Sequence, residues 1–210
     1  MADFDRIKET VLEGKVAQIA DLVQGALDEG ISPQEIIDEG LIAGMDEVGV
    51  RFKNDEMFIP EVLVSAKTMH TGMEVLRPML ESTGVRSAGK VVLGTVKGDL
   101  HDIGKNLVGM MFQGAGFEVV DLGVDQSAEN FVAAVQKEGG QVVAMSALLT
   151  TTMTGMAGVI EALKKALLRD QVKVMVGGAP VSQEFAESIG ADGYAPDAAT
   201  AVEKLKELLG

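Results

Sequence analysis

The spacing of apolar residues changes near residue 85 of this 210-residue chain, and that change limits the folds it can adopt. Up to about Ser82, apolar residues recur every three or four positions, which is the pattern of amphipathic helices. One such series is Val62, Leu63, Ala66, Met69, Met73 and Leu76. After Lys90, short apolar runs alternate with amphipathic stretches, the pattern of strands joined by helices. The sequence therefore predicts a helical segment followed by an α/β segment.

Turn-forming residues divide the first segment into about four helices. Breaks occur at three places, Gly14, residues 30–33 and residues 54–60. Ser32 is placed to cap a helix whose first turn holds Pro33. A polar, glycine-containing stretch, residues 82–90, has the composition of a linker. We therefore expect two domains, a small four-helix bundle over residues 1–85 and a second domain over residues 90–210.

The second segment alternates strictly between candidate strands and candidate helices. The strands are expected at residues 91–96, 117–121, 142–146, 172–176 and 192–194. The helices are expected at residues 103–115, 127–138, 152–168, 182–189 and 197–209. This order predicts an α/β fold with a doubly wound, five-stranded parallel sheet of the flavodoxin-like or Rossmann-like type. Ligands of such sheets bind beyond the carboxyl ends of the strands, so the residues after each strand are the candidates for a site.

Charge and composition exclude several classes of function. Lysine and arginine total 18 against 32 aspartate and glutamate residues, a net charge of −14. Negative charge of this size opposes binding to nucleic acid and to anionic membrane surfaces. The chain has no cysteine, and its acidic start is unlike a secretory signal peptide. We expect a cytoplasmic protein.

The first candidate strand leads into a loop with a histidine two residues after an aspartate, His101 and Asp99. The Asp99 carboxylate is placed to accept the second N–H of the imidazole, which leaves the other ring nitrogen available to a metal. His70 is the only other histidine, and without cysteine an ordinary zinc site cannot be built. A metal would have to bring most of its ligands, as in a corrin or a haem. A plainer alternative is a loop histidine beside a helix-capping aspartate.

The residues after the other strands add hydroxyl groups and glycines. The third strand runs into a hydroxyl-rich stretch, residues 146–152, which suits a long polar ligand tail. Gly177 and Gly178 follow the fourth strand and would let a flat group approach the backbone. Each feature alone also fits an ordinary turn or helix start. The loop after the first strand matches neither a Walker loop nor a G-x-G-x-x-G motif, which disfavours a Walker-type phosphate site and a nicotinamide cofactor.

Three of these elements together resemble the signature of cobalamin-binding proteins. That signature is Asp-x-His-x-x-Gly, then Ser-x-Leu, then Gly-Gly, and here it occurs at residues 99–104, 146–148 and 177–178. The chain is similar to the cobalamin-binding module of methionine synthase. In size and layout it more closely resembles the corrinoid proteins of methyltransferase systems that act on methanol, methylamines, betaines or aryl methyl ethers. The resemblance implies a helical cap domain, residues 1–85, and a cobalamin-binding domain, residues 90–210.

The resemblance also assigns expected roles to particular residues. It implies that His101 is the lower axial ligand of cobalt, with Asp99 as its hydrogen-bonded partner. Thr152 would be the third member of this relay, where methionine synthase has a serine. Phe52 and Ile59 would lie over the upper face of the cobalt, although both also fit ordinary bundle core. The other expected cofactor contacts are Gly98, Leu100, Asp102, Ile103, Gly104, Ser146, Leu148, Thr150, Gly177, Gly178, Tyr194 and Ala195.

The resemblance implies a function in one-carbon metabolism. The protein would carry a methyl group on the cobalt of cobalamin or a related corrinoid, which alternates between cob(I)alamin and methylcobalamin. It would be a non-catalytic subunit whose partners are a substrate-specific methyltransferase, an acceptor methyltransferase that uses tetrahydrofolate or a thiol, and a reductive activating protein. The alternatives are a cobalamin-binding regulatory module, an isomerase subunit, and a flavodoxin-like domain without cobalamin.

Overall fold

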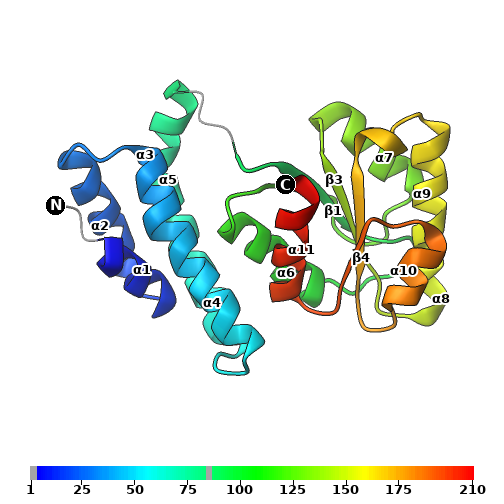
Figure 1. Cartoon of the computed structure of the whole chain (residues 1–210), viewed down its shortest axis with the longest axis horizontal. Helices are drawn as coiled ribbons and strands as arrows, with labels where there is room; N and C mark the ends of the chain where they lie inside the picture. The colour runs from blue at the N-terminus through cyan, green and yellow to red at the C-terminus, as the bar shows by residue number, and fades with distance from the viewer. Residues whose placement is uncertain (1–3, 84–86) are drawn as a thin grey trace. The chain divides into compact units, whose positions relative to one another are not determined.

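A computed structural model describes residues 4–83 and 87–210 of the chain (Figure 1). The chain divides into two compact units, residues 1–88 with 113–116 and residues 89–112 with 117–210. The predicted linker, residues 82–90, overlaps the end of a helix at Thr83, and its residues 84–86 lie outside the described residues. No helix in the described part of the chain is long and apolar enough to cross a membrane.

The first unit is helical. Its elements are α1 Phe4–Leu12, α2 Val16–Asp28, α3 Pro33–Glu35, the π-helical turn η1 Ile36–Ile42, α4 Ala43–Lys53 and α5 Ile59–Thr83. Because α3, η1 and α4 follow one another directly, the described residues form four helical stretches, as predicted. The predicted helix start is also confirmed, since the Ser32 hydroxyl accepts a hydrogen bond from the Glu35 backbone N–H at 3.2 Å and Pro33 follows Ser32.

Residues at three- and four-residue spacing form the core of this unit, as the pattern predicts. The most buried of them are Ile7, Val11, Ile19, Val23, Leu41, Val48, Val62, Met69 and Leu76. The π-helical turn was not predicted. Gly40 lies within it, and a Cβ atom there would lie 2.9 Å from Ile7 Cγ2, so the glycine lets α1 pack closely against the turn.

Strands and helices alternate along the rest of the chain. They are β1 Lys90–Thr95, α6 Ile103–Gly114, β2 Glu118–Asp121, α7 Ala128–Glu138, β3 Val142–Ser146, α8 Thr150–Met153, α9 Gly155–Lys165, the 3-10 turn η2 Arg169–Gln171, β4 Lys173–Gly177, α10 Gln183–Ile189, β5 Gly193–Ala195 and α11 Ala198–Leu209. All neighbouring strands are parallel, in the order β2-β1-β3-β4-β5. This is the flavodoxin-like order, and the predicted doubly wound sheet is confirmed.

Helices cover both faces of the sheet. Figure 1 shows α7 and α9 on one face and α6 and α11 on the other. Phe131 of α7 is fully buried against Gly94 of β1, where a Cβ atom would lie 2.8 Å from Phe131 Cζ. Burial on both faces explains why β1, β3 and β4 are nearly continuous runs of apolar residues.

One predicted helix is divided and shorter than expected. In place of a helix over residues 152–168, the structure has α8 and α9, separated at Thr154. The second of them ends at Lys165. Leu167 takes a φ of 59°, a left-handed backbone through which a helix does not continue.

Candidate functional site

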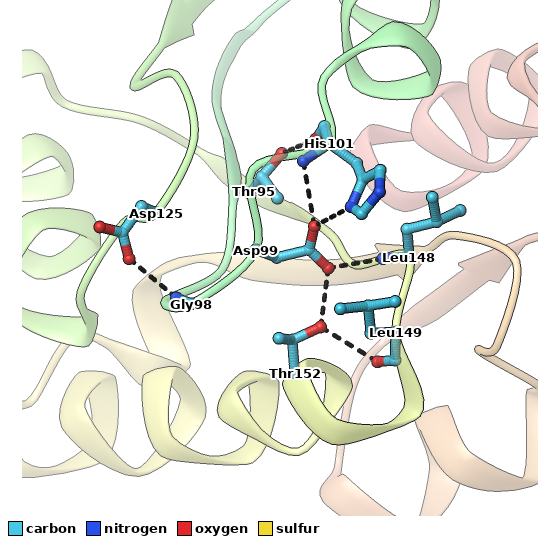
Figure 2. Close-up of polar contacts among 8 residues, drawn as sticks. All are labelled: Thr95, Gly98, Asp99, His101, Asp125, Leu148, Leu149 and Thr152. Atoms are coloured by element: carbon cyan, nitrogen blue, oxygen red, sulfur yellow. Dashed lines mark hydrogen bonds and ion pairs between the residues drawn. The ribbon is translucent and has the colours of Figure 1, made fainter.

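The loop between β1 and α6 presents His101 at the carboxyl edge of the sheet (Figure 2). The Thr95 hydroxyl donates to the His101 carbonyl oxygen at 2.9 Å, which ties the far end of the loop back to the strand. Gly98 takes a φ of +81°, a left-handed conformation that glycine adopts without steric cost. The loop is therefore a compact turn anchored at both ends.

The Asp99 carboxylate accepts hydrogen bonds on both of its oxygen atoms. Its Oδ1 atom accepts from the His101 backbone N–H at 3.1 Å and lies 2.7 Å from His101 Nδ1. Its Oδ2 atom accepts from the Leu148 backbone N–H at 2.8 Å and from the Thr152 hydroxyl at 2.7 Å. The Asp99 side chain is 0% exposed, whereas that of His101 is 51% exposed. A buried carboxylate thus holds a solvent-accessible imidazole.

These hydrogen bonds keep Asp99 ionised. Burial by itself raises the pKa of a carboxyl group, but the donors from Thr152, Leu148 and His101 outweigh it and hold the pKa of Asp99 well below its usual range. An ionised carboxylate only accepts hydrogen bonds, so the His101 Nδ1 atom that faces it carries a hydrogen. In a neutral imidazole the Nε2 atom then has the lone pair and is the atom able to bind a metal.

Thr152 joins this network from α8. Its hydroxyl also lies 3.0 Å from the Leu149 carbonyl oxygen. A hydroxyl has one hydrogen to donate, and the shorter contact to the charged Asp99 is the stronger of the two. Thr152 follows β3, whereas Asp99 and His101 follow β1, and these two strands are neighbours in the sheet. The network therefore spans the topological switch point, where ligands of such sheets bind.

The Gly-Gly pair at the end of β4 has a structural role of its own. Gly178 takes a φ of +121°, and a Cβ atom there would lie 1.9 Å from the Ala147 carbonyl oxygen. Only glycine permits this approach of two backbone segments. The Ala147 N–H in turn donates to the Gly177 carbonyl oxygen at 3.3 Å. Ala147 precedes Leu148, whose N–H reaches Asp99, so the pair helps to place one of the donors to the carboxylate.

Most of the other predicted cofactor contacts belong to the same unit as this network. Leu100 and Ile103 flank His101 and are 72% and 77% exposed, which is unusual for side chains of this size and polarity. Leu148, on the β3 side, is 43% exposed. The remaining ones in this unit are Asp102, Gly104, Ser146 at the end of β3, Thr150 at the start of α8, and Tyr194 and Ala195 in β5. Their contacts with a cofactor stay a prediction.

Two predicted residues and the second histidine belong to the first unit. Phe52 in α4 is half-buried, and Ile59, the first residue of α5, is 42% exposed. Their place over the cobalt stays a prediction. His70 in α5 is exposed, with its Nε2 atom 3.4 Å from Glu74 Oε1.

Sequence reasoning missed two groups beside the histidine loop. Asp125, between β2 and α7, accepts a hydrogen bond from the Gly98 N–H at 2.8 Å. Lys105 in α6 has a side chain only 1% exposed, and its Nζ atom lies 2.5 Å from Asp121 Oδ2. Both acids follow or end β2, the one strand whose carboxyl end showed no recognisable pattern. A search of every strand end for acids would have found them.

The arrangement can supply one ligand to a metal. The Nε2 atom of His101 makes no hydrogen bond within residues 4–83 and 87–210, and it faces outward from the loop. No group of three or more His, Cys, Asp or Glu side chains in those residues could hold a metal ion. A metal bound by the four nitrogens of a macrocycle needs only one such ligand on its lower side. The residues present therefore fit a corrinoid.

Comparison with known proteins gives matches over both units. The B12 binding domain model matches residues 89–203, and a second model of the same description matches residues 3–77. A corrinoid protein of Desulfitobacterium hafniense is 46% identical, with 100% of this chain and 99% of that protein aligned. Trimethylamine corrinoid protein 1 of Methanosarcina acetivorans is 44% identical, over 97% of this chain and 95% of that protein.

A solved structure agrees with these sequence matches. The methanol:cobalamin methyltransferase complex of Methanosarcina barkeri contains a chain with a TM-score of 0.85 and 33% identity, covering 97% of this chain and 78% of that one. Helical segment, parallel sheet and signature loop thus all agree with one family. The chain belongs to the family of corrinoid proteins that have a B12 binding domain.

Proposed function

We propose that this protein carries a methyl group on the cobalt of a bound corrinoid, between two partner methyltransferases. The observation that carries the proposal is the His101–Asp99–Thr152 network. Of the two nitrogens of the His101 ring, it leaves only Nε2 without a hydrogen-bond partner among the described residues. The relatives named as corrinoid proteins favour this function over a regulatory module or an isomerase subunit. When bound, the corrinoid supplies a cobalt ion that can accept and release a methyl group.

Each residue of the network has a separate role. Asp99 holds the hydrogen of His101 on Nδ1, which orients the ring and makes Nε2 a better electron donor. Thr152 and the Leu148 N–H hold the carboxylate on its other oxygen. If Nε2 were instead protonated, the ionised Asp99 would stabilise the resulting imidazolium. The network could thus hold His101 either as a neutral ligand or as a protonated side chain.

The relatives support one of the proposed partners. One is named for trimethylamine, and the solved complex is a methanol:cobalamin methyltransferase, which supports a substrate-specific methyltransferase as the donor partner. A methyl carrier also needs a second methyltransferase, with tetrahydrofolate or a thiol as acceptor. A reductive activating protein would restore oxidised cobalt. We propose both as further partners.

Histidine ligation can be tested directly, because the chain has only two histidines. Apoprotein loaded with hydroxocobalamin and reduced by one electron should show hyperfine splitting from an imidazole nitrogen in its EPR spectrum. Labelling histidine with ¹⁵N should change that splitting. The splitting that depends on the histidine label should vanish in His101→Ala and persist in His70→Ala, the matched control.

Methyl transfer forms the second half of the test. Holoprotein, reduced and incubated with a methanol or trimethylamine methyltransferase and its ¹⁴C-labelled substrate, should elute with the label, and apoprotein should not. Wild-type protein that takes up no hydroxocobalamin would contradict the proposal. So would a splitting that survives His101→Ala and still changes when histidine is labelled with ¹⁵N.

A further inference from the structure

Asp125 contacts the histidine loop at two points, although the function proposed above makes no use of it. Its Oδ1 atom accepts a hydrogen bond from the Gly98 backbone N–H at 2.8 Å. Its own backbone N–H donates to the Asp99 carbonyl oxygen at 2.9 Å. Figure 2 shows Asp125 and His101 on opposite sides of Asp99. One residue therefore holds the backbone both at Gly98, just before Asp99, and at the carbonyl group of Asp99 itself.

The segment that carries Asp125 is itself fixed to β1. The Thr95 N–H donates to the Gly123 carbonyl oxygen at 3.0 Å, and the Gln126 N–H donates to the Thr95 carbonyl oxygen at 2.9 Å. Val96 forms a parallel bridge with Gln126. The pairing of β1 with β2 thus continues beyond the ends of both strands, and it brings Asp125 beside the loop.

Asp125 takes a backbone conformation that residues other than glycine rarely adopt. Its φ is 56°, in the left-handed region, where aspartate is tolerated better than most residues. Such a conformation persists where the contacts around it determine it. The two hydrogen bonds to the loop are such contacts. The Lys97 Nζ atom, 3.4 Å from Asp125 Oδ1, adds an opposite charge.

We infer that Asp125 is a positioning residue for His101, because it fixes the backbone of Gly98 and Asp99 from which the carboxylate reaches the imidazole. The carboxylate of Asp99 can orient the ring only if the Asp99 backbone is itself held. Leu148 and Thr152 hold the carboxylate, and Asp125 holds the main chain. The inference rests on the proposed function in that it takes His101 as the cobalt ligand.

Two variants separate the carboxylate of Asp125 from its backbone conformation. Asp125→Gly removes the acceptor and keeps the left-handed φ accessible. Asp125→Asn keeps an acceptor oxygen and tolerates the same φ, so it is the matched control. Amide hydrogen exchange of the apoprotein should show Gly98 protected in the wild type. We expect exchange about fivefold to tenfold faster in Asp125→Gly, from the loss of one hydrogen bond, and close to wild type in Asp125→Asn.

The imidazole gives the second readout. The ¹⁵N spectrum of apoprotein His101 should show one tautomer, with hydrogen on Nδ1, in the wild type and in Asp125→Asn. A mixture of tautomers is expected in Asp125→Gly. After loading with hydroxocobalamin and one-electron reduction, the histidine splitting in the EPR spectrum should weaken in Asp125→Gly alone.

The results that would contradict the inference are distinct from those that would contradict the proposed function. Fast exchange of the Gly98 amide in the wild type would overturn the inference even if Asp125→Gly failed to fold. Wild-type tautomer and EPR signals in a folded Asp125→Gly protein would overturn it as well. Failure of the wild type to bind hydroxocobalamin would contradict the proposed function, and the apoprotein measurements would still test Asp125.

Discussion

His101 and His70 each lie beside a carboxylate, but the surroundings of the two pairs differ. The His101 Nδ1 atom is 2.7 Å from Asp99, whose side chain is 0% exposed and is held by further donors. The His70 Nε2 atom is 3.4 Å from Glu74, whose side chain is 45% exposed and also pairs with Arg77. The first pair lies in a loop after a strand, and the second lies on the surface of a long helix.

The comparison shows that an orienting carboxylate must itself be held. An exposed ion pair loses side-chain entropy when it forms and is screened by water, so it contributes little. In the buried pair, donors other than the imidazole also hold the carboxylate in place. The low polarity around the buried carboxylate strengthens each of these contacts. Changes to Asp99 and to the groups around it should therefore lower the free energy of unfolding more than a change to Glu74.

The largest effect is expected from Gly178→Ala. Its new methyl group would overlap the Ala147 carbonyl oxygen, and the residue would keep an unfavourable φ. We expect a loss of about 3 kcal/mol or more in the free energy of unfolding, measured in urea. Displacement of Ala147 should also move the Leu148 N–H, so the NMR signals of His101 should change and those of His70 should not.

Gly190→Ala is the control for this variant. Gly190 also has a positive φ, +77°, but a Cβ atom there would meet nothing within 4 Å. Its cost should be about 1–2 kcal/mol, from the left-handed backbone alone. Equal costs for the two variants would show that the close approach to Ala147 is unimportant.

Asp99→Asn should have the next largest effect. Each carboxylate oxygen accepts one backbone N–H, from His101 or from Leu148. An amide in either orientation would therefore turn its NH₂ group toward a fixed N–H donor. We expect a loss of about 2–3 kcal/mol in the free energy of unfolding, as for a buried polar group left without a partner.

Glu74→Gln provides the matched change at the other histidine. It should cost no more than about 0.5 kcal/mol, as is usual for an exposed position. An equally small loss in Asp99→Asn would show that the buried and the exposed carboxylate contribute equally to stability.

The smallest effect is expected from Thr152→Val, which keeps the shape of the side chain and removes one donor to Asp99. We expect a loss of about 1.5 kcal/mol at neutral pH. The hydrogen bonds lower the pKa of Asp99 in the folded protein below its ordinary value of 3.8. Their contribution is therefore complete above that value and is lost as the pH falls through it toward the folded pKa. The difference in free energy of unfolding between wild type and Thr152→Val should decrease over the same pH range.

Thr152→Ser tests whether the hydroxyl is the cause. Serine retains the donor, so its pH dependence should follow the wild type even if the lost methyl group lowers stability somewhat. The difference in free energy of unfolding between wild type and Thr152→Val could instead stay constant from neutral to strongly acidic pH. That result would show that Thr152 does not lower the pKa of Asp99.

Much of the fold could be predicted because its signals are local. The valine runs at residues 91–92, 119–120 and 142–143 mark strands by composition, and Ser32 marks a helix start by hydrogen-bonding chemistry. The pairing of His101 Nδ1 with Asp99 was expected from their spacing of two residues, and the contact is present. Such features depend on residues close together in the sequence.

The features that were missed depend on backbone atoms or on distant residues. The Leu148 N–H that reaches Asp99 belongs to a residue whose side chain gives no indication of it. Asp125 is related to Gly98 only through the pairing of β1 with β2. The left-handed backbone at Leu167 and the π-helical turn η1 likewise have no counterpart in the local sequence pattern.

The donors to Asp99 come from widely separated parts of the chain, and this limits how the site could be transplanted. A designer who grafted residues 98–104 into another α/β scaffold would transfer the imidazole and the carboxylate without Leu148 and Thr152, which lie 49 and 53 residues from Asp99. The graft would have a histidine free to turn. A functional transplant would need the adjacent ends of β1 and β3, together with a glycine after β4 that allows the backbone of Ala147 to come close.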